Sequence, residues 1–281
     1  MSHIKNTLAK FNFRPKKRLG QNFLLDSKAL ETICDTACGN SPGIILEIGA
    51  GIGNLSILLA QKTEKLYLVE KDSAFAPILN DTLKNYVNTK MFFSDILDFD
   101  LKSIFDGRKI TIVGNLPYYI TSPILFHLLS QKDMIDRIII TVQKEVGLRI
   151  VAKPGTKDFG RLSCVMQFYT APRLVEIFPR RLFSPAPAVD SSLLELKVLE
   201  RPSVEVKSEE QFLILIKTMF QHRRKTLLNG IIAAGGMNLS KETMLQAIKA
   251  ADIEPMIRAE QIGLAEMARL ADEIQDRQKK N

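Results

Sequence analysis

The stretch Ile-Ile-Leu-Glu-Ile-Gly-Ala-Gly-Ile-Gly, residues 44–53, decides the fold of this chain. A short apolar run that does not alternate, followed at once by three glycines, is typical of a strand buried on both faces that ends in a tight turn. Glycines at this place let the backbone turn sharply and let a ligand approach the main chain closely. The stretch therefore predicts the first strand of an open α/β sheet, with a ligand site at its carboxyl end.

Strand and helix patterns alternate around this stretch. Further strands are predicted at residues 66–69, 91–93, 110–113 and 137–142, and helices at residues 54–61, 73–84 and 123–130. Such alternation predicts a mostly parallel sheet with helices on both faces, which is a Rossmann-like α/β fold.

The pattern changes in the second half of the chain. A helix is predicted at residues 161–169 and strands at 172–178 and 189–199, before Arg201-Pro202-Ser203 marks a boundary. Beyond it, residues 209–228, 241–250 and 259–275 favour helix. We therefore predict two domains: residues 1–202 with the sheet and a basic N-terminal segment, and residues 203–281 as a small all-helical domain.

The composition narrows the class of protein. The chain has 281 residues, of which 46% are hydrophobic and 25% charged, as in ordinary globular proteins. Its three cysteines form no C-x-x-C pair, which argues against a disulfide framework or a zinc site, so we predict no metal. No apolar stretch reaches the length of a membrane span, and no signal peptide is recognisable. We expect a cytoplasmic protein that does not bind membranes.

Positive charge is concentrated in two places. The net charge is +8, and residues 1–25 hold six basic residues and no acidic one; a second cluster is Arg223-Arg224-Lys225. Because basic clusters neutralise phosphates, both predict contact with a nucleic acid. For the first cluster, a disordered tail is the alternative.

Acidic residues at the predicted strand ends indicate which ligand binds. Glu70 ends the second strand about 20 residues after Gly49, where a carboxylate can accept both hydroxyls of a ribose. NAD is the alternative ligand, but the third glycine of its fingerprint is replaced by Asn54. The acidic Glu47 also suits a cationic sulfonium better than a diphosphate. These features favour S-adenosylmethionine over NAD as the cofactor. A glycine turn that binds no ligand is the structural alternative.

Asp95 follows the third predicted strand and has two interpretations. Its carboxylate can accept a hydrogen bond from the amine of an adenine ring. Aspartate is also a good helix cap, which is the purely structural alternative.

The motif Asn115-Leu116-Pro117-Tyr118 follows the strand at residues 110–113 and predicts the reaction. An adenine N6 amine is a weak nucleophile until its lone pair is freed from the ring. The side-chain oxygen of Asn115 and a carbonyl of Leu116 or Pro117 can accept its two N–H bonds, while Tyr118 offers a ring for the extruded base. The motif therefore predicts methylation of adenine N6, mainly by positioning.

With these motifs the chain resembles the KsgA-type ribosomal RNA adenine dimethyltransferase family, over roughly residues 14–270. The resemblance lies in six segments: residues 17–24, 47–53, 114–118, 154–162, 183–191 and 220–227. Two positions depart from the family pattern, since Ala188 stands where lysine is frequent and Phe159 where tyrosine is common. These departures concern loops expected to contact RNA.

The resemblance implies a Rossmann-like S-adenosylmethionine methyltransferase fold and N6,N6-dimethylation of two adjacent adenosines in the 3′-terminal hairpin of 16S rRNA. It implies a role in 30S ribosome biogenesis, with small-subunit rRNA in a 30S assembly particle as the partner, and we expect a monomer. The cofactor-binding residues it implies are Asn22, Leu24, Gly49, Glu70, Asp95 and Asn115. It implies that Phe183 stacks on the target adenine opposite Tyr118; core packing is the alternative for Phe183.

Two other functions compete with this one. The antibiotic-resistance methylases of large-subunit rRNA share the motifs at residues 21–24 and 115–118, but residues 183–191 and the Arg223 cluster favour the small-subunit enzyme. An rRNA-binding assembly factor without catalysis is the alternative from another class, and Glu70, Asp95 and Asn115 argue against it because a binding module would be free to lose them.

Overall fold

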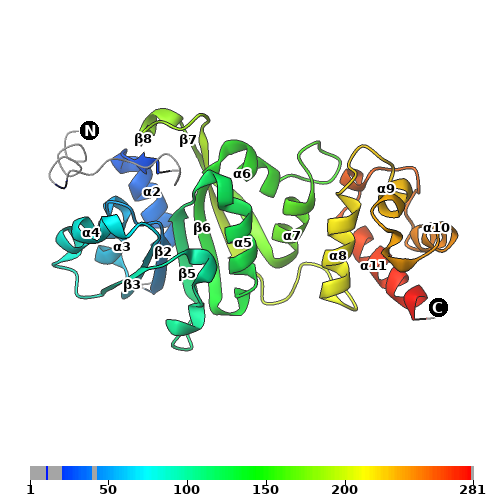
Figure 1. Ribbon diagram of the computed structural model, residues 1–281, viewed down its shortest axis with the longest axis horizontal. Helices are drawn as coiled ribbons and strands as arrows, with labels where there is room; N and C mark the ends of the chain where they lie inside the picture. Colours follow the sequence, from blue (N-terminus) through cyan, green and yellow to red (C-terminus); the bar gives the residue numbers. More distant parts are fainter. Residues whose placement is uncertain (1–10, 12–20, 40–42, 280–281) are drawn as a thin grey trace. The chain divides into compact units, whose positions relative to one another are not determined.

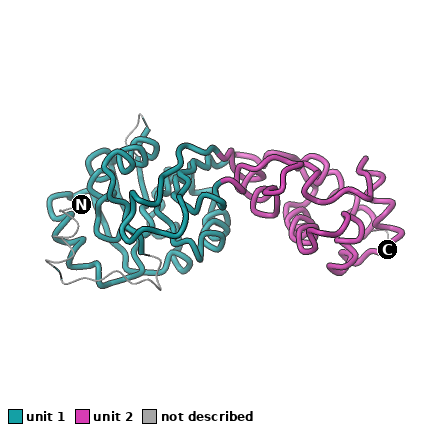
Figure 2. The backbone as a smooth tube through the Cα atoms, turned by 90° about the horizontal axis from the view of Figure 1, so that it is seen from above, with its two compact units in different colours: residues 1–147, 173–198 teal, residues 148–172, 199–281 magenta. Residues whose placement is uncertain are grey.

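The computed structural model describes residues 11, 21–39 and 43–279. The chain divides into two compact units, shown in two colours in Figure 2. The first unit holds residues 1–147 and 173–198, and the second holds residues 148–172 and 199–281. The sheet unit thus ends at residue 198, near the boundary expected at residue 202, while the helical unit also takes the segment 148–172.

A seven-stranded sheet organises the first unit (Figure 1), with the strand order β4-β3-β2-β5-β6-β9-β7. Its strands are β2 Ile44–Ile48, β3 Lys65–Glu70, β4 Thr89–Phe93, β5 Ile110–Asn115, β6 Ile135–Gln143, β7 Thr170–Phe178 and β9 Ser191–Val198. β2 pairs in parallel with β3 and β5, and the pairs β3–β4 and β5–β6 are parallel too, whereas β9 is antiparallel to β6. The predicted mostly parallel sheet is confirmed.

The sheet order reverses at β2, and this reversal places the ligand site. From β2 the chain first adds β3 and β4 on one side and then β5 and β6 on the other. Ligands of open α/β sheets bind outside the carboxyl ends of the strands at such a switch point. All five residues of β2 are buried, Glu47 among them, so the strand that begins the site is also the centre of the core.

Helices connect these strands, as the alternating pattern predicts. The α-helices are α2 Ser27–Cys38, α3 Asn54–Lys62, α4 Ala76–Leu83, α5 Thr121–Leu129 and α6 Lys144–Ile150. Short 3-10 helices follow or precede them: η2 Ser73–Phe75, η3 Ile96–Asp98, η4 Leu101–Ser103, η5 Tyr118–Ile120, η6 Lys132–Met134 and η7 Arg180–Leu182. A separate two-stranded ribbon pairs β1, Phe23–Leu24, with β8, Phe183–Ser184.

The second unit is helical. It contains α7 Arg161–Tyr169, α8 Glu209–Met219, α9 Leu227–Ala233, η8 Gly236–Asn238, α10 Lys241–Ala250, η9 Ala259–Gln261 and α11 Leu264–Gln278. The ring of Phe168 in α7 lies 4.7 Å from the ring of Phe212 in α8, measured between centroids, which shows how segment 148–172 packs with the later helices.

The predicted single helix at residues 209–228 is wrong, because α8 ends at Met219 and α9 begins at Leu227. The intervening turn carries Arg223, whose guanidinium donates to the carbonyls of Lys157 (2.6 Å) and Phe159 (3.0 Å). It also forms an ion pair with Glu260 at 3.2 Å. These long-range contacts engage Arg223 within the unit and outweigh the local preference for helix, although its side chain is still 41% exposed. Arg224 and Lys225 are exposed as well.

Among the described residues, no helix combines the length and the apolar character needed to cross a bilayer. The same residues hold no group of three or more histidine, cysteine, aspartate or glutamate side chains arranged for a metal ion.

Gly114 offers a test of how tightly the central strands pack. It lies on β5 beside Ile48 of β2, and an added Cβ would meet the Ile48 carbonyl oxygen at 2.9 Å and the Ile48 Cβ at 3.2 Å. We expect Gly114→Ala to lower the free energy of unfolding by about 1–3 kcal/mol, because a buried strand has to shift. Gly43→Ala is the control, since its Cβ would meet nothing within 4 Å. Chemical denaturation measures both variants, and equal losses would contradict this view of the packing.

Candidate functional site

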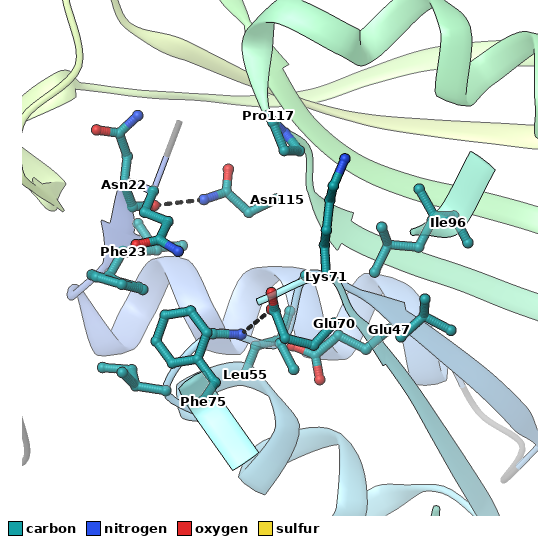
Figure 3. Close-up of a pocket in the computed structure, with 18 of the residues that line it drawn as sticks. Asn22, Phe23, Glu47, Leu55, Glu70, Lys71, Phe75, Ile96, Asn115 and Pro117 are labelled. Atoms are coloured by element: carbon teal, nitrogen blue, oxygen red, sulfur yellow. Dashed lines mark hydrogen bonds between the residues drawn. The ribbon is translucent and has the colours of Figure 1, made fainter. Parts of the chain in front are cut away.

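A single pocket at the carboxyl ends of β2, β3, β4 and β5 gathers the residues expected to bind the cofactor (Figure 3). All six of them line it: Asn22, Leu24, Gly49, Glu70, Asp95 and Asn115. Segments that lie up to 93 residues apart in the chain therefore meet in one place. Parallel strands explain this, because their carboxyl ends reach the same edge of the sheet.

The glycine turn after β2 forms the floor of the pocket. Gly49, Gly51 and Gly53 have φ angles of 74°, 54° and 85°, a backbone conformation that residues other than glycine rarely adopt. The Gly49 N–H donates to the carbonyl of Val69 at 2.9 Å, which ties the turn to the end of β3. The turn then leads into α3, so the backbone comes close to the pocket without side chains in between.

Glu70 holds this turn in place from the end of β3. Its carboxylate accepts the backbone N–H of Gly51 at 2.9 Å and that of Asp72 at 2.8 Å. Burial raises the pKa of Glu70 even though both bonds favour the charged form. A carboxylate has about four acceptor positions, so the side chain can still accept donors from a ligand in the pocket.

Glu47 is a second buried carboxylate in the pocket wall. It is 3% exposed, and its Oε2 atom has no hydrogen-bond partner in the described structure. Burial raises its pKa to about 7. A buried acceptor without a partner is costly, so this atom marks a position where a bound ligand with a donor or a positive charge fits.

Asn115, at the end of β5, has a fixed side chain. Its Nδ2 atom donates to the backbone carbonyl of Asn22 at 2.8 Å, which is drawn as a dashed line in Figure 3. This bond turns the amide oxygen away from Asn22, and Figure 3 shows it on the side where Pro117 lies. An amide in this orientation presents an acceptor that is already aligned before a substrate arrives.

The rest of the motif separates into a part that reaches the pocket and a part that does not. Pro117 lines the pocket, whereas Leu116 as a whole residue is only 1% exposed and is not among the lining residues. The Pro117 carbonyl already accepts the N–H of Ile120 at 3.2 Å and the hydroxyl of Thr121 at 3.3 Å. Of the two carbonyls that the sequence leaves open, that of Leu116 is therefore the better candidate for a substrate amine.

Tyr118 and Phe183 are not among the residues that line the pocket. The hydroxyl of Tyr118 pairs with that of Ser191 at 2.7 Å, and burial raises the pKa of this phenol. Phe183 is 3% exposed and belongs to the core, where β8 pairs with β1. The base-stacking role expected of Phe183 would need this ring to be uncovered. Tyr119, which sequence reasoning missed, lines the pocket and is 58% exposed.

Asp95 caps a 3-10 helix and also lies at the pocket. Its Oδ1 atom accepts the N–H of Leu97 at 3.0 Å and so caps η3, while the residue also lines the pocket. Its Oδ2 atom pairs with the ammonium of Lys71 at 2.5 Å, a contact that sequence reasoning missed. Burial alone would raise the pKa of Asp95, but the bonds from Lys71 and Leu97 outweigh it and lower the pKa.

Comparison with protein families gives one match that spans nearly the whole chain. The model of the family described as "Ribosomal RNA adenine dimethylase" matches residues 12–276. Two similar relatives are both named ribosomal RNA small subunit methyltransferase A. The one from Alkaliphilus metalliredigens is 39% identical over 99% of this chain and 98% of its own length. The one from Streptococcus mutans is 41% identical over 96% and 94%.

Solved structures share the fold. A dimethyladenosine transferase from Plasmodium falciparum superposes with a TM-score of 0.75 and 23% identity, covering 88% of this chain and 95% of its own. The 23S rRNA methyltransferase ErmE gives a TM-score of 0.69 at 24% identity, over 90% and 99%. These likenesses confirm the predicted Rossmann-like methyltransferase fold.

The raised pKa of Glu47 leads to a test by pH. The folded protein holds this proton up to about pH 7, whereas the carboxyl ordinarily loses it near pH 4.5. The wild type therefore loses stability at this residue as the pH rises through that window, and Glu47→Gln removes the loss. We expect the variant to gain about 1–3 kcal/mol over the wild type between pH 4.5 and pH 8.

Denaturation at several pH values measures this difference. The control is Glu64→Gln on the surface, where hydrogen bonding from Arg108 lowers the pKa of Glu64, so no gain with rising pH is expected. A difference between Glu47→Gln and wild type that stays constant across the window would show that Glu47 is charged throughout.

Proposed function

Because this chain belongs to the ribosomal RNA adenine dimethylase family, and is thus an S-adenosylmethionine-dependent enzyme that dimethylates adenine in ribosomal RNA, we propose that its substrate is a pair of adjacent adenosines in the 3′-terminal hairpin of small-subunit rRNA. The relatives named above carry the words "small subunit" and match over almost their full length. The likeness to the 23S enzyme, at 24% identity, supports the fold alone.

The residues of the pocket fit the cofactor. When bound, S-adenosylmethionine supplies an electrophilic methyl group on a cationic sulfonium. Glu70 would accept the ribose hydroxyls, and Asp95 would accept the adenine amine. The unpartnered Oε2 of Glu47 supports a cationic or donating ligand at this place. Gly49 and Leu24 would shape the walls, and Asn22 would act through the carbonyl that holds Asn115.

The single observation that carries the reaction is the fixed amide of Asn115 in the same pocket as these carboxylates. Its Oδ1 and the carbonyl of Leu116 would accept the two N–H bonds of adenine N6, so that the nitrogen lone pair is no longer held by the ring. Pro117, with φ at −59°, keeps this corner of the backbone rigid. The chain's contribution is then alignment rather than acid–base chemistry.

The aromatic residues would hold the extruded base. Tyr119 offers an exposed ring at the pocket, and Tyr118 lies next to it with its hydroxyl anchored on Ser191. Stacking on such rings holds a flipped base without reading its sequence. Phe183 completes the pair with Tyr118 if substrate binding uncovers it.

The setting of the reaction is part of the proposal. Contact with a 30S assembly particle would use the basic N-terminal segment, whose residues 1–10 and 12–20 lie outside the described residues, together with the exposed Arg224 and Lys225. We propose that the protein acts as a monomer in the cytoplasm and that it takes part in 30S biogenesis.

Methylation of purified ribosomal particles tests the substrate. Small-subunit particles and large-subunit particles that lack adenine dimethylation are incubated with the protein and S-adenosylmethionine, and their nucleosides are analysed by mass spectrometry. We expect N6,N6-dimethyladenosine in the small-subunit particles, at two adjacent positions in the 3′-terminal hairpin. Modification of large-subunit rRNA alone would overturn the proposal.

Asn115→Ala tests the role of the amide. We expect turnover to fall by about a hundredfold or more, because the amide aligns the amine in the transition state. The affinity for S-adenosylhomocysteine should change far less. Asn80→Ala on the exposed face of α4 is the control and should leave both unchanged. Equal losses of turnover and cofactor affinity in Asn115→Ala would count against this role and in favour of a cofactor contact.

A further inference from the structure

We propose that Lys71 competes with the cofactor for Asp95, so that the Lys71–Asp95 ion pair is a latch that the adenine amine has to open. The inference rests on the proposed function, in which Asp95 accepts that amine. It adds a residue that sets how tightly the cofactor binds and how strongly its amine is recognised.

The latch lies inside the cofactor pocket. Lys71 follows directly after β3 and Asp95 follows β4, the neighbouring parallel strand, and both line the pocket. The Lys71 ammonium is 2.5 Å from Oδ2 of Asp95. Figure 3 shows the Lys71 side chain standing up from the end of β3 on the side of the pocket where Pro117 lies.

Both oxygens of Asp95 are engaged. Oδ1 accepts the N–H of Leu97, a bond that is part of the backbone structure of η3, and Oδ2 accepts Lys71. A ligand amine can displace only the second partner without breaking the cap. The Asp95 side chain is 19% exposed, so the carboxylate end of its bond to Lys71 is partly shielded from water.

The other carboxylates next to Lys71 are already committed. Glu70 accepts the N–H groups of Gly51 and Asp72, and it is buried. Asp72 accepts the N–H of Ala74 and the side chain of Gln21. The Lys71 side chain is 54% exposed, so once released from Asp95 its ammonium can return to water at little cost.

This arrangement has a consequence for recognition. A ligand with an exocyclic amine replaces Lys71 as the donor to Asp95. A ligand without such an amine leaves the ion pair intact, so the Asp95 carboxylate keeps its partner. Lys71 therefore weakens the binding of a ligand that has the amine. It also reduces the loss of affinity that a ligand without the amine would otherwise suffer. Removing the ammonium should sharpen the discrimination, because an unpaired carboxylate then faces any base that brings no donor.

Lys71→Met tests the latch, since methionine keeps an unbranched apolar stem and loses the charge. The probes are S-adenosylhomocysteine and S-inosylhomocysteine, in which a carbonyl replaces the amine. Neither carries a sulfonium and both carry the same amino-acid charges, so a general charge effect of Lys71 acts equally on both. Calorimetry measures both dissociation constants. We expect S-adenosylhomocysteine to bind about three- to fivefold more tightly to the variant than to the wild type. The inosyl ligand should bind more weakly to the variant, so its dissociation constant divided by that of the adenosyl ligand should rise by more than this factor.

Two further variants complete the design. Lys65→Met removes the lysine that begins β3, whose ion pair with Asp106, at 2.9 Å, lies outside the pocket, and it should leave both constants unchanged. Lys71→Arg keeps a charge and should restore the wild-type ratio. Unchanged or weaker binding of S-adenosylhomocysteine to Lys71→Met, or an equal shift for both ligands, would overturn the latch while leaving the methyltransferase function intact. Failure of the wild-type protein to bind S-adenosylhomocysteine would overturn both.

Discussion

The pocket depends on the hydrogen bond from the Gly51 N–H to the carboxylate of Glu70, which joins the ends of the neighbouring strands β2 and β3. Every second residue of the glycine turn, Gly49, Gly51 and Gly53, has a positive φ angle. Such a buried turn needs hydrogen-bond partners for its backbone N–H groups. Glu70 and the Val69 carbonyl supply these partners. Glu70 also lines the pocket, so the residue that fixes the glycine turn is the one that we propose to accept the ribose hydroxyls.

Three carboxylates share this pocket, and their surroundings set them apart. Burial raises the pKa of Glu47 to about 7, and one of its carboxylate oxygens has no hydrogen-bond partner in the described structure. Glu70 is buried as well, but two backbone N–H groups compensate in part. Asp95 has a lowered pKa because Lys71 and Leu97 donate to it. The three carboxyl groups around a cationic ligand therefore differ in how readily they carry a negative charge.

Alignment is the means of catalysis that the geometry supports. The bond from Asn115 to the Asn22 carbonyl fixes the amide, and the engagement of the Pro117 carbonyl in η5 points to the Leu116 carbonyl as its companion. β1, which follows Asn22, is itself held by β8. The amide that we propose as the acceptor for the substrate amine is therefore supported through a second strand ribbon, well outside the motif that contains it.

The sequence by itself determined the sheet, the glycine turn and the set of strand-end residues Glu70, Asp95 and Asn115, because apolar runs and their spacing are local properties and parallel strands end at one edge. Only the tertiary structure decided where neighbouring side chains point. Tyr118 turns to Ser191 while Tyr119 reaches the pocket, and Phe183 is covered because β8 pairs with a distant strand. Arg223 interrupts a predicted helix, and Lys71 finds Asp95 on the next strand. Each of these outcomes is set by partners far apart in the chain, whose proximity no local pattern of residues encodes.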